Sequence, residues 1–300
     1  MNMSTTATEV PTLRTNLATY PVTKAMKDGR VTSELVKLDY CGPTPAHNGF
    51  KAMVRENAFD AGELAIVTYL QAKAYGKPYV MLPVPISGRF QHHCAGFNLD
   101  FGHLNPKDIE GKKVGVRSYA QTTGLWIRGV LRHEYGVDLD KVTWMTLIDG
   151  HLAEYSDPSN CVRLPKGSSI PDMMLSGELD AALLGEDMPK DPRVRTLVPD
   201  AHNAAKAWYQ REGFVPINHV FVVHQDLSKK RPDILRDLYR MLGESRGLTE
   251  GGVPAVFPPL GLEANRKGLQ TAIDWALDQK IIPRKLSVDE LFDDVTGSLG

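Results

Sequence analysis

The stretch Val114-Gly-Val-Arg-Ser-Tyr-Ala-Gln-Thr-Thr-Gly-Leu-Trp-Ile-Arg-Gly129 changes its hydrophobic period partway along. Val114 and Val116 stand at strand spacing, while the apolar residues from Ile127 onward recur at helical spacing. The pattern predicts a buried strand, a polar turn and a helix. The free N–H groups and dipole at that helix start favour an anion near residues 118–123, although a plain strand-to-helix connection with capping hydroxyls is the alternative.

Composition narrows the class of protein. The chain has 300 residues, of which 42% are hydrophobic and 24% charged, as expected for a globular protein with two lobes. The net charge is -1 and the basic residues are scattered, so no nucleic-acid partner is expected. No apolar run reaches the length of a membrane span, and the first residues lack an apolar leader, so we expect a cytoplasmic protein without a membrane partner.

A short internal repeat predicts the organisation of the lobes. Residues 59–67 form an expected strand that leads into a helix from Thr68, and residues 170–185 follow the same helix, turn and strand pattern. Two further strands, around His92 and around His219, are expected to cross between the lobes. The prediction is an α/β, two-lobed protein with a central interlobe cleft and two crossing strands.

The boundaries follow from these elements. We expect a disordered N-terminus at 1–10, a discontinuous first lobe at 11–97 plus 215–300, and a second lobe at 98–214. Further strands are expected at 13–17, 35–40, 137–144, 179–184 and 217–223, and helices at 232–242, 262–277 and 288–295, the last capped by Ser287.

Several separated motifs are informative together. They are Asp28-Gly-Arg-Val31, Phe59-Asp60 with Glu63 and Tyr69-Leu70, Phe90 with His92, Gly115-Val116 with Tyr119, Trp126-Ile-Arg-Gly129, His133-Glu-Tyr-Gly136, Gly177-Glu-Leu-Asp-Ala181, and Pro216 with His219. In these motifs the chain resembles the 4,5-dihydroxyphthalate decarboxylase family, which is itself similar to type 2 periplasmic solute-binding proteins and to pyrimidine-synthesis proteins of thiamine metabolism. The resemblance covers nearly the whole chain, from Tyr20 to about Leu242.

The chain departs from the family pattern at three places. Pro21-Val22 stands where the family typically has Asp-Arg, Gln91 replaces an Arg, and Arg117-Ser118 replaces Pro-Glu. Charged groups that hold a substrate carboxylate are thus lost in one lobe, and one appears in the other. The resemblance therefore leaves the identity of the substrate open.

The resemblance implies cofactor-independent loss of CO2 from a hydroxylated aromatic acid, such as 4,5-dihydroxyphthalate, by protonation of a ring carbon in the cleft. This chemistry requires an acid, a base and an anion site. The catalytic candidates are His92, His219 and Glu63, and the substrate-binding candidates are Arg117, Ser118, Tyr119, Thr122, Thr123, Arg128, Thr68, Tyr69 and Tyr20.

Each candidate also has a structural interpretation. His92 and His219 are either acid/base groups or packed hinge residues, and His93 points to the opposite face of the same expected strand. Glu63 is either paired with a basic group or poised as an acid/base. Arg128 lies opposite the apolar stripe, which favours solvent exposure. Trp208 and Tyr209 either stack on an aromatic ligand or pack in the core. The other histidines, His47, His103, His133, His151, His202 and His224, are expected to be surface or structural residues.

Two other functions compete with the decarboxylase. A solute-binding protein or sensor for a small aromatic acid would use the same cleft without catalysis. A pyrimidine-precursor enzyme would consume a histidine as a reagent. The spacing of Cys41, Cys94 and Cys161 matches neither a disulfide framework nor a zinc site, and no metal is expected. The expected partners are a small aromatic carboxylate and, at most, a second copy of the chain.

Overall fold

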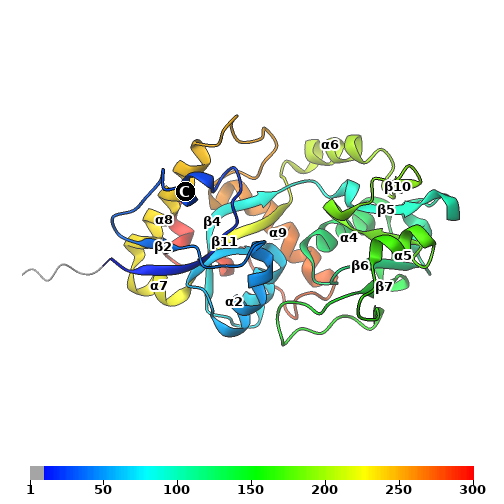
Figure 1. Ribbon diagram of the computed structural model, residues 1–300, viewed down its shortest axis with the longest axis horizontal. Helices are drawn as coiled ribbons and strands as arrows, with labels where there is room; N and C mark the ends of the chain where they lie inside the picture. The colour runs from blue at the N-terminus through cyan, green and yellow to red at the C-terminus, as the bar shows by residue number, and fades with distance from the viewer. Residues whose placement is uncertain (1–9) are drawn as a thin grey trace, which may run out of the picture.

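The structure is a computed structural model that describes residues 10–300. The expected disordered segment 1–10 therefore lies outside the described residues, apart from Val10. Two α/β lobes lie side by side along the long axis, each built on its own sheet (Figure 1). Among residues 10–300, no helix has both the length and the apolar run needed for a bilayer crossing.

The first lobe is built on a five-stranded sheet in the order β2-β1-β3-β11-β4. Its strands are β1 (Thr12–Asn16), β2 (Lys37–Asp39), β3 (Ala61–Ala65), β4 (Tyr79–Gly88) and β11 (Ile217–His224). β1 runs parallel to β2 and β3, whereas β11 is antiparallel to β3 and β4. The helices in this part of the chain are α1 (Lys24–Lys27), α2 (Phe50–Glu56), α3 (Ile66–Ala74), α7 (Gln225–Lys230) and α8 (Pro232–Gly247).

The second lobe is built on a six-stranded sheet in the order β10-β5-β9-β6-β7-β8. Its strands are β5 (Ala95–Asn98), β6 (Lys113–Val116), β7 (Thr143–Thr146), β8 (Cys161–Arg163), β9 (Ala181–Leu183) and β10 (Val194–Thr196), and its helices are α4 (Thr122–Tyr135), α5 (Ile170–Ser176) and α6 (Ala201–Glu212). The predicted lobe boundaries stay a prediction, and β5 joins this sheet from Ala95, ahead of position 98.

The quoted stretch forms the predicted strand, turn and helix. β6 is central in its sheet, between β9 and β7, and Val114 and Val116 are fully buried. A polar turn leads from β6 into α4, whose N-terminus therefore lies at the carboxyl end of the parallel strands. Open α/β sheets bind ligands at this edge.

The segments that connect the lobes differ in part from the prediction. His219 lies in β11, as predicted, but His92 lies in a 3-10 helix, η2 (His92–Cys94), and the predicted strand there is wrong. The N–H of Cys94 donates to the carbonyl of Gln91 over 2.8 Å, which closes a turn before β5 begins. The two segments contact each other, because Gln91 Nε2 donates to Asn218 Oδ1 over 2.8 Å.

The C-terminal prediction is wrong in extent. Ser287 and Glu290 do form reciprocal capping hydrogen bonds, but only the 3-10 turn η7 (Asp289–Leu291) follows, in place of a helix over 288–295. Capping groups satisfy the first N–H groups of a turn without extending it into a helix.

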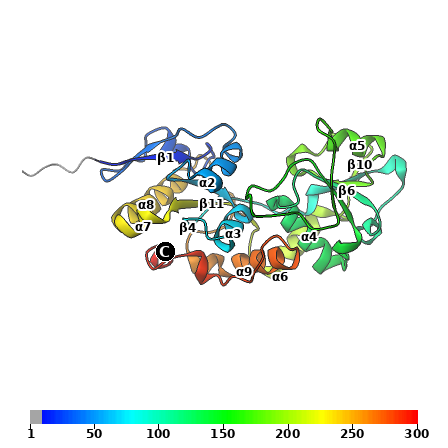
Figure 2. The ribbon, with the colours of Figure 1, turned by 90° about the horizontal axis from the view of Figure 1, so that it is seen from below.

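α9 (Leu262–Asp278) lies across the junction between the lobes and contacts both α3 and α4 (Figure 2). Trp275 of α9 packs edge-on against Trp126 of α4, with ring centroids 5.5 Å apart. Just beyond α9, Gln279 Nε2 donates to the carbonyl of Leu125 over 3.0 Å. α9 thus supports the helix whose N-terminus faces the cleft.

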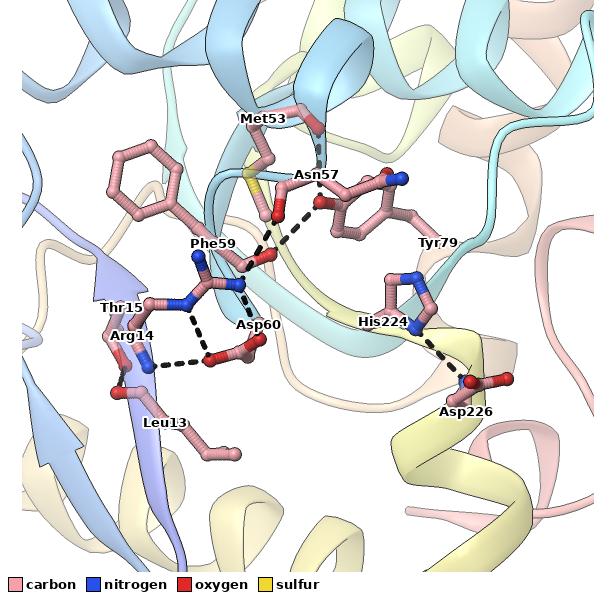
Figure 3. Close-up of polar contacts among 10 residues, drawn as sticks. All are labelled: Leu13, Arg14, Thr15, Met53, Asn57, Phe59, Asp60, Tyr79, His224 and Asp226. Carbon is pink, nitrogen blue, oxygen red and sulfur yellow. Dashed lines mark hydrogen bonds and ion pairs between the residues drawn. The ribbon is translucent and has the colours of Figure 1, made fainter.

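A polar network fixes the start of β3 against β1 (Figure 3). Asp60 accepts from the Arg14 backbone N–H at 2.8 Å and from the Arg14 guanidinium at 3.0 Å. The Tyr79 hydroxyl lies 2.9 Å from the carbonyl of Phe59. Further along, Gly62 has φ +149, and a Cβ there would overlap the backbone of Asn16. These contacts hold β3 close to β1 and so position the next residue, Glu63.

Contact between α4 and α9 predicts the effect of one substitution. At Gly129 of α4 a Cβ would overlap the ring of Trp275, so Gly129→Ala is expected to lower the free energy of unfolding by about 2 kcal/mol through overpacking. Gly243→Ala, in α8, is the matched control, since its Cβ meets only Leu260 at 3.7 Å, and it should stabilise by up to about 1 kcal/mol. Urea unfolding measures both, and equal stability of the two variants would contradict this packing.

Candidate functional site

A cavity of about 470 Å³ opens between the two lobes. Pockets of this size suit a small organic ligand. From the first-lobe side it is lined by Tyr20, His47, Phe50, Ala65, Ser87, Gly88, Arg89, Asn218 and His219. From the second-lobe side it is lined by Arg117, Ser118, Ala120, Gln121, Thr122, Thr123, Ile148, His151, Leu183, Leu184, Glu186 and Asp187.

An acidic and a basic side chain meet at the first-lobe wall. Glu63 of β3 is fully buried, and its Oε2 lies 2.6 Å from Nδ1 of His219 on the neighbouring strand β11. Because the carboxylate accepts from Nδ1–H, the imidazole is oriented with Nε2 as the nitrogen available to a ligand. Glu63 is thus paired with a basic group, as one of its two interpretations required.

Tyr20 completes this group. Its hydroxyl donates to Glu63 Oε2 over 3.0 Å and lies 3.3 Å from His219 Nδ1, while the Ala18 N–H donates to Glu63 Oε1 over 2.7 Å. Burial, and then the Glu63 carboxylate, raise the pKa of Tyr20 above its usual range. The hydroxyl therefore stays protonated and acts as a donor to the carboxylate.

The N-terminus of α4 forms the second-lobe wall. Thr122 and Thr123 are its first residues, and Gln121 at the N-cap position makes no capping hydrogen bond with its side chain. Ser118 Oγ and Thr122 Oγ1 are buried and lack a hydrogen-bond partner among the described residues. The first N–H groups of a helix lack an intrahelical partner, and together with the helix dipole and the unsatisfied hydroxyls they form a site for an anion.

Arg117 adds a full positive charge to this wall. Its Nη1 donates to His47 Nε2 over 3.5 Å, and its Nε has no partner among residues 10–300. Arg89, also in the cavity, instead forms an ion pair with Glu186. Arg117 is therefore the cation whose charge is available to a ligand, and its fork geometry suits a carboxylate.

The structure places several candidates outside the cavity. His92 is buried against Trp208, with ring centroids 6.0 Å apart, and Trp208 packs on Phe214 in the core. Tyr69 is fully buried, and its hydroxyl donates to the carbonyl of Leu291. Tyr119 is also buried and stacks edge-on with the ring of Trp144. Tyr209, likewise absent from the cavity, packs edge-on against Phe90 and stays partly exposed.

Arg128 is buried, contrary to its predicted exposure. Its Nε donates to Gln279 Oε1 over 2.9 Å, its Nη2 donates to the carbonyl of Tyr119 over 2.5 Å, and its guanidinium lies 3.9 Å from the Tyr119 ring centroid. The guanidinium is enclosed by the rings of Tyr119 and Trp144 and by Gln279, which lies just beyond α9, so this side chain has no access to solvent. Arg128 supports the turn before α4 and does not line the cavity.

Two histidines that were expected to be surface or structural residues line the cavity instead. His47 lies beside Arg117, and His151 has its Nδ1 2.7 Å from Thr68 Oγ1. Burial, and then Arg117, lower the pKa of both, that of His151 to about 4. Thr68 was predicted to bind the substrate. It does not line the cavity, and its hydroxyl contacts His151, which does. His47 lies in the 3-10 helix η1 (Ala46–Gly49) and His151 lies in a loop, so no periodic pattern in the sequence indicated that either side chain faces the cavity.

Metal ligation is a separate matter. Within residues 10–300, no three or more His, Cys, Asp or Glu side chains gather as metal ligands would. The expectation of a reaction without metal or cofactor stays a prediction.

Comparison with the sequences of known proteins gives two similar proteins that carry the same name. No family model matches the chain. It is 29% identical over 226 residues to a 4,5-dihydroxyphthalate decarboxylase from Comamonas testosteroni, covering 71% of this chain and 68% of that protein. It is also 29% identical over 203 residues to a 4,5-dihydroxyphthalate decarboxylase from Pseudomonas putida, covering 62% and 77%. The chain is therefore similar in sequence to two proteins named 4,5-dihydroxyphthalate decarboxylase.

Comparison with solved structures confirms the predicted fold. The structure is similar to that of the alkanesulfonate-binding protein from Xanthomonas axonopodis pv. citri bound to MOPS, with a TM-score of 0.57, 13% identity, and coverage of 94% of this chain and 98% of that one. The predicted type 2 periplasmic-binding-protein-like fold is therefore correct. At this identity the likeness concerns the fold alone.

Two buried histidines of this protein, His92 and His151, predict how its stability depends on pH. Burial holds the pKa of His92 and His151 at about 4, below the ordinary value near 6.5, so the unfolded chain binds protons first as the pH falls. Between about pH 7 and pH 5 each should remove about 2 kcal/mol from the free energy of unfolding. His92→Asn should reduce that loss, and exposed His202→Asn should not; an identical pH dependence in all three proteins would be inconsistent with a neutral buried His92.

Proposed function

We propose that this protein is a carboxy-lyase that releases CO2 from a hydroxylated aromatic carboxylic acid, such as 4,5-dihydroxyphthalate. The observation that carries the proposal is that a proton-donating pair and an anion site lie on opposite walls of one cavity. The Glu63–His219 pair enters from the first lobe, and Arg117 with the N-terminus of α4 enters from the second. The names of the two curated relatives support the same reaction.

His219 acts as the acid in the proposed step. Its imidazolium transfers the Nε2 proton to the ring carbon that bears the leaving carboxylate, and a ring electron pair forms the new C–H bond. The C–C bond to the carboxylate then breaks, its electron pair restores the aromatic ring, and CO2 leaves. A solvent proton restores the imidazolium, so the net reaction consumes one proton.

Glu63 stabilises the protonated acid before the step, and a substrate hydroxyl stabilises the ring charge that develops during it. The carboxylate of Glu63 accepts from His219 Nδ1 and counters the imidazolium charge. A ring hydroxyl ortho or para to the protonated carbon donates electron density to the cationic ring. Substrates without such a hydroxyl lack this stabilisation and are expected to react slowly.

The anion site at α4 suits the carboxylate that remains on the product. An interaction that holds the leaving carboxylate equally tightly before the reaction would stabilise the ground state and oppose departure of neutral CO2. We therefore assign the retained carboxylate to Arg117, Ser118 and the α4 N-terminus. The leaving carboxylate faces the apolar part of the lining, which includes Phe50 and Ala65.

The same geometry bears on the competing interpretation as a binding protein. A solute-binding protein for an acid needs the anion site but has no use for a buried carboxylate directed at a histidine in the cavity. The Glu63–His219 pair therefore favours the enzyme. A cytoplasmic location and a homodimer stay predictions from the sequence.

A panel of aromatic acids tests the reaction. Hydroxylated phthalates should lose CO2 fastest, hydroxybenzoates with one carboxylate more slowly because they leave the anion site empty, and phthalate without a hydroxyl slowest. CO2 release and ring absorbance measure this order. If acids bind and raise the thermal unfolding midpoint but none loses CO2, the protein is a binding protein or sensor and the proposal is wrong.

Substitution of the acid pair tests the mechanism. His219→Asn keeps a polar side chain but removes the proton donor, and Glu63→Gln keeps the side-chain size but removes the counter-charge, so each should lower kcat by about 100-fold or more. His202→Asn, on the exposed surface of α6, should leave kcat unchanged. Circular dichroism checks folding. A wild-type kcat in both cavity variants would remove this pair from the mechanism.

A further inference from the structure

A long irregular segment of the second lobe reaches the first lobe. Residues 147–160 connect β7 to β8 and extend toward α2 and α3 (Figure 2). Arg55 of α2 donates to the carbonyls of His151 and Gly150, over 2.6 and 3.2 Å, and Lys77 forms an ion pair with Glu154 at 2.5 Å. Long loops without secondary structure in compact lobes are commonly functional.

This loop places the His151 imidazole in the cavity with a defined orientation. Nδ1 lies 2.7 Å from Oγ1 of Thr68, a buried residue in the first turn of α3. Phe50 packs edge-on against both His151 and His219, with ring centroids 5.6 and 5.4 Å apart. With Nδ1 occupied by Thr68, Nε2 is the nitrogen that remains for a ligand.

We propose that His151 is a second catalytic histidine, whose Nε2 accepts a hydrogen bond from a ring hydroxyl of the substrate, and that Thr68 is its positioning residue. The inference rests on the proposed function. Withdrawing the hydroxyl hydrogen raises electron density on the oxygen and hence on the ring, which makes protonation of the ring carbon easier. The hydrogen bond transfers no atom, so the balance of the reaction is unchanged.

The surroundings of His151 maintain the form that this role needs. A neutral imidazole has one acceptor nitrogen, whereas the imidazolium has none. Burial disfavours a positive charge on the ring, and the charges of four basic groups add to this effect: Arg117, Lys51, His47 and Arg55. His151 is therefore neutral at ordinary pH, while His219, beside Glu63, has a carboxylate to counter a charge.

Different lobes supply the two parts of this contact. His151 belongs to the second-lobe loop, whereas Thr68 and Arg55 belong to the first lobe. Separation of the lobes breaks these hydrogen bonds and releases the ring. The acceptor for the hydroxyl is thus oriented when the lobes are together, as they are in this structure.

A binding comparison tests the hydroxyl contact without relying on turnover. In the His219→Asn background, calorimetry gives Kd for 4,5-dihydroxyphthalate and for phthalate, and the hydroxylated acid should bind about tenfold more tightly. Adding His151→Phe, which keeps a planar ring but has no nitrogen, should reduce that preference to about twofold or less without changing the Kd of phthalate. A preference that survives this substitution overturns the proposal.

Positioning by Thr68 has its own test. Thr68→Val replaces the hydroxyl with a methyl group and should lower the hydroxyl preference and kcat while leaving the Kd of phthalate nearly unchanged. Thr68→Ser, which retains the hydroxyl, should restore both. Failure of Thr68→Ser to restore them would show a packing effect and would overturn the role of Thr68.

Turnover separates this proposal from the function on which it rests. Wild-type protein that releases no CO2 from any acid overturns the proposed function, whatever the binding data show. Active wild type whose His151→Phe variant keeps kcat and hydroxyl preference overturns the assignment of His151 alone. Exposed His202→Phe is the control and should leave both quantities unchanged.

Discussion

The buried carboxylate of Glu63 constrains the rest of the site. A charged group with no exposure costs several kcal/mol unless its oxygens are satisfied. Here the partners come from the segment that follows β1, through the Ala18 N–H and the Tyr20 hydroxyl, and from β11, through His219. Because β3 lies between β1 and β11, one carboxylate aligns two cavity-facing side chains that are far apart in the sequence.

The two lobes contribute different chemistry to the cavity. The first lobe supplies the acid pair, whereas the second supplies a helix N-terminus, free hydroxyls and the charge of Arg117. Arg128, buried behind the turn, donates to the carbonyl of Tyr119 and so holds the anion site in shape without touching the cavity. The fold brings these groups together but does not dictate a reaction, since proteins of this fold also bind solutes.

Sequence periodicity predicted the elements that are regular and the residues placed on them. The strand-to-helix change at 114–129 and the strand that carries His219 are correct because each has a clear apolar period. The strand predicted at His92 was wrong, and the position of His151 in the cavity was not predicted. These residues lie in a 3-10 turn and a loop, where no period shows which way a side chain points. The predicted exposure of Arg128 was wrong because Gln279, just beyond α9, packs over its side chain. The local sequence pattern of α4 does not reveal this long-range contact.

The distribution of charge separates a catalyst from a binder. A protein that only binds an aromatic acid would be weakened by a carboxylate placed behind the cavity wall, because the negative charge of Glu63 opposes an anionic ligand unless His219 carries a proton. The hydrogen bond between them makes the pair electrically neutral in its protonated form, and that form holds a proton beside the ligand. The arrangement lowers the affinity of the cavity for an anion but places a transferable proton beside the ligand. Decarboxylation of an electron-rich ring requires such a proton.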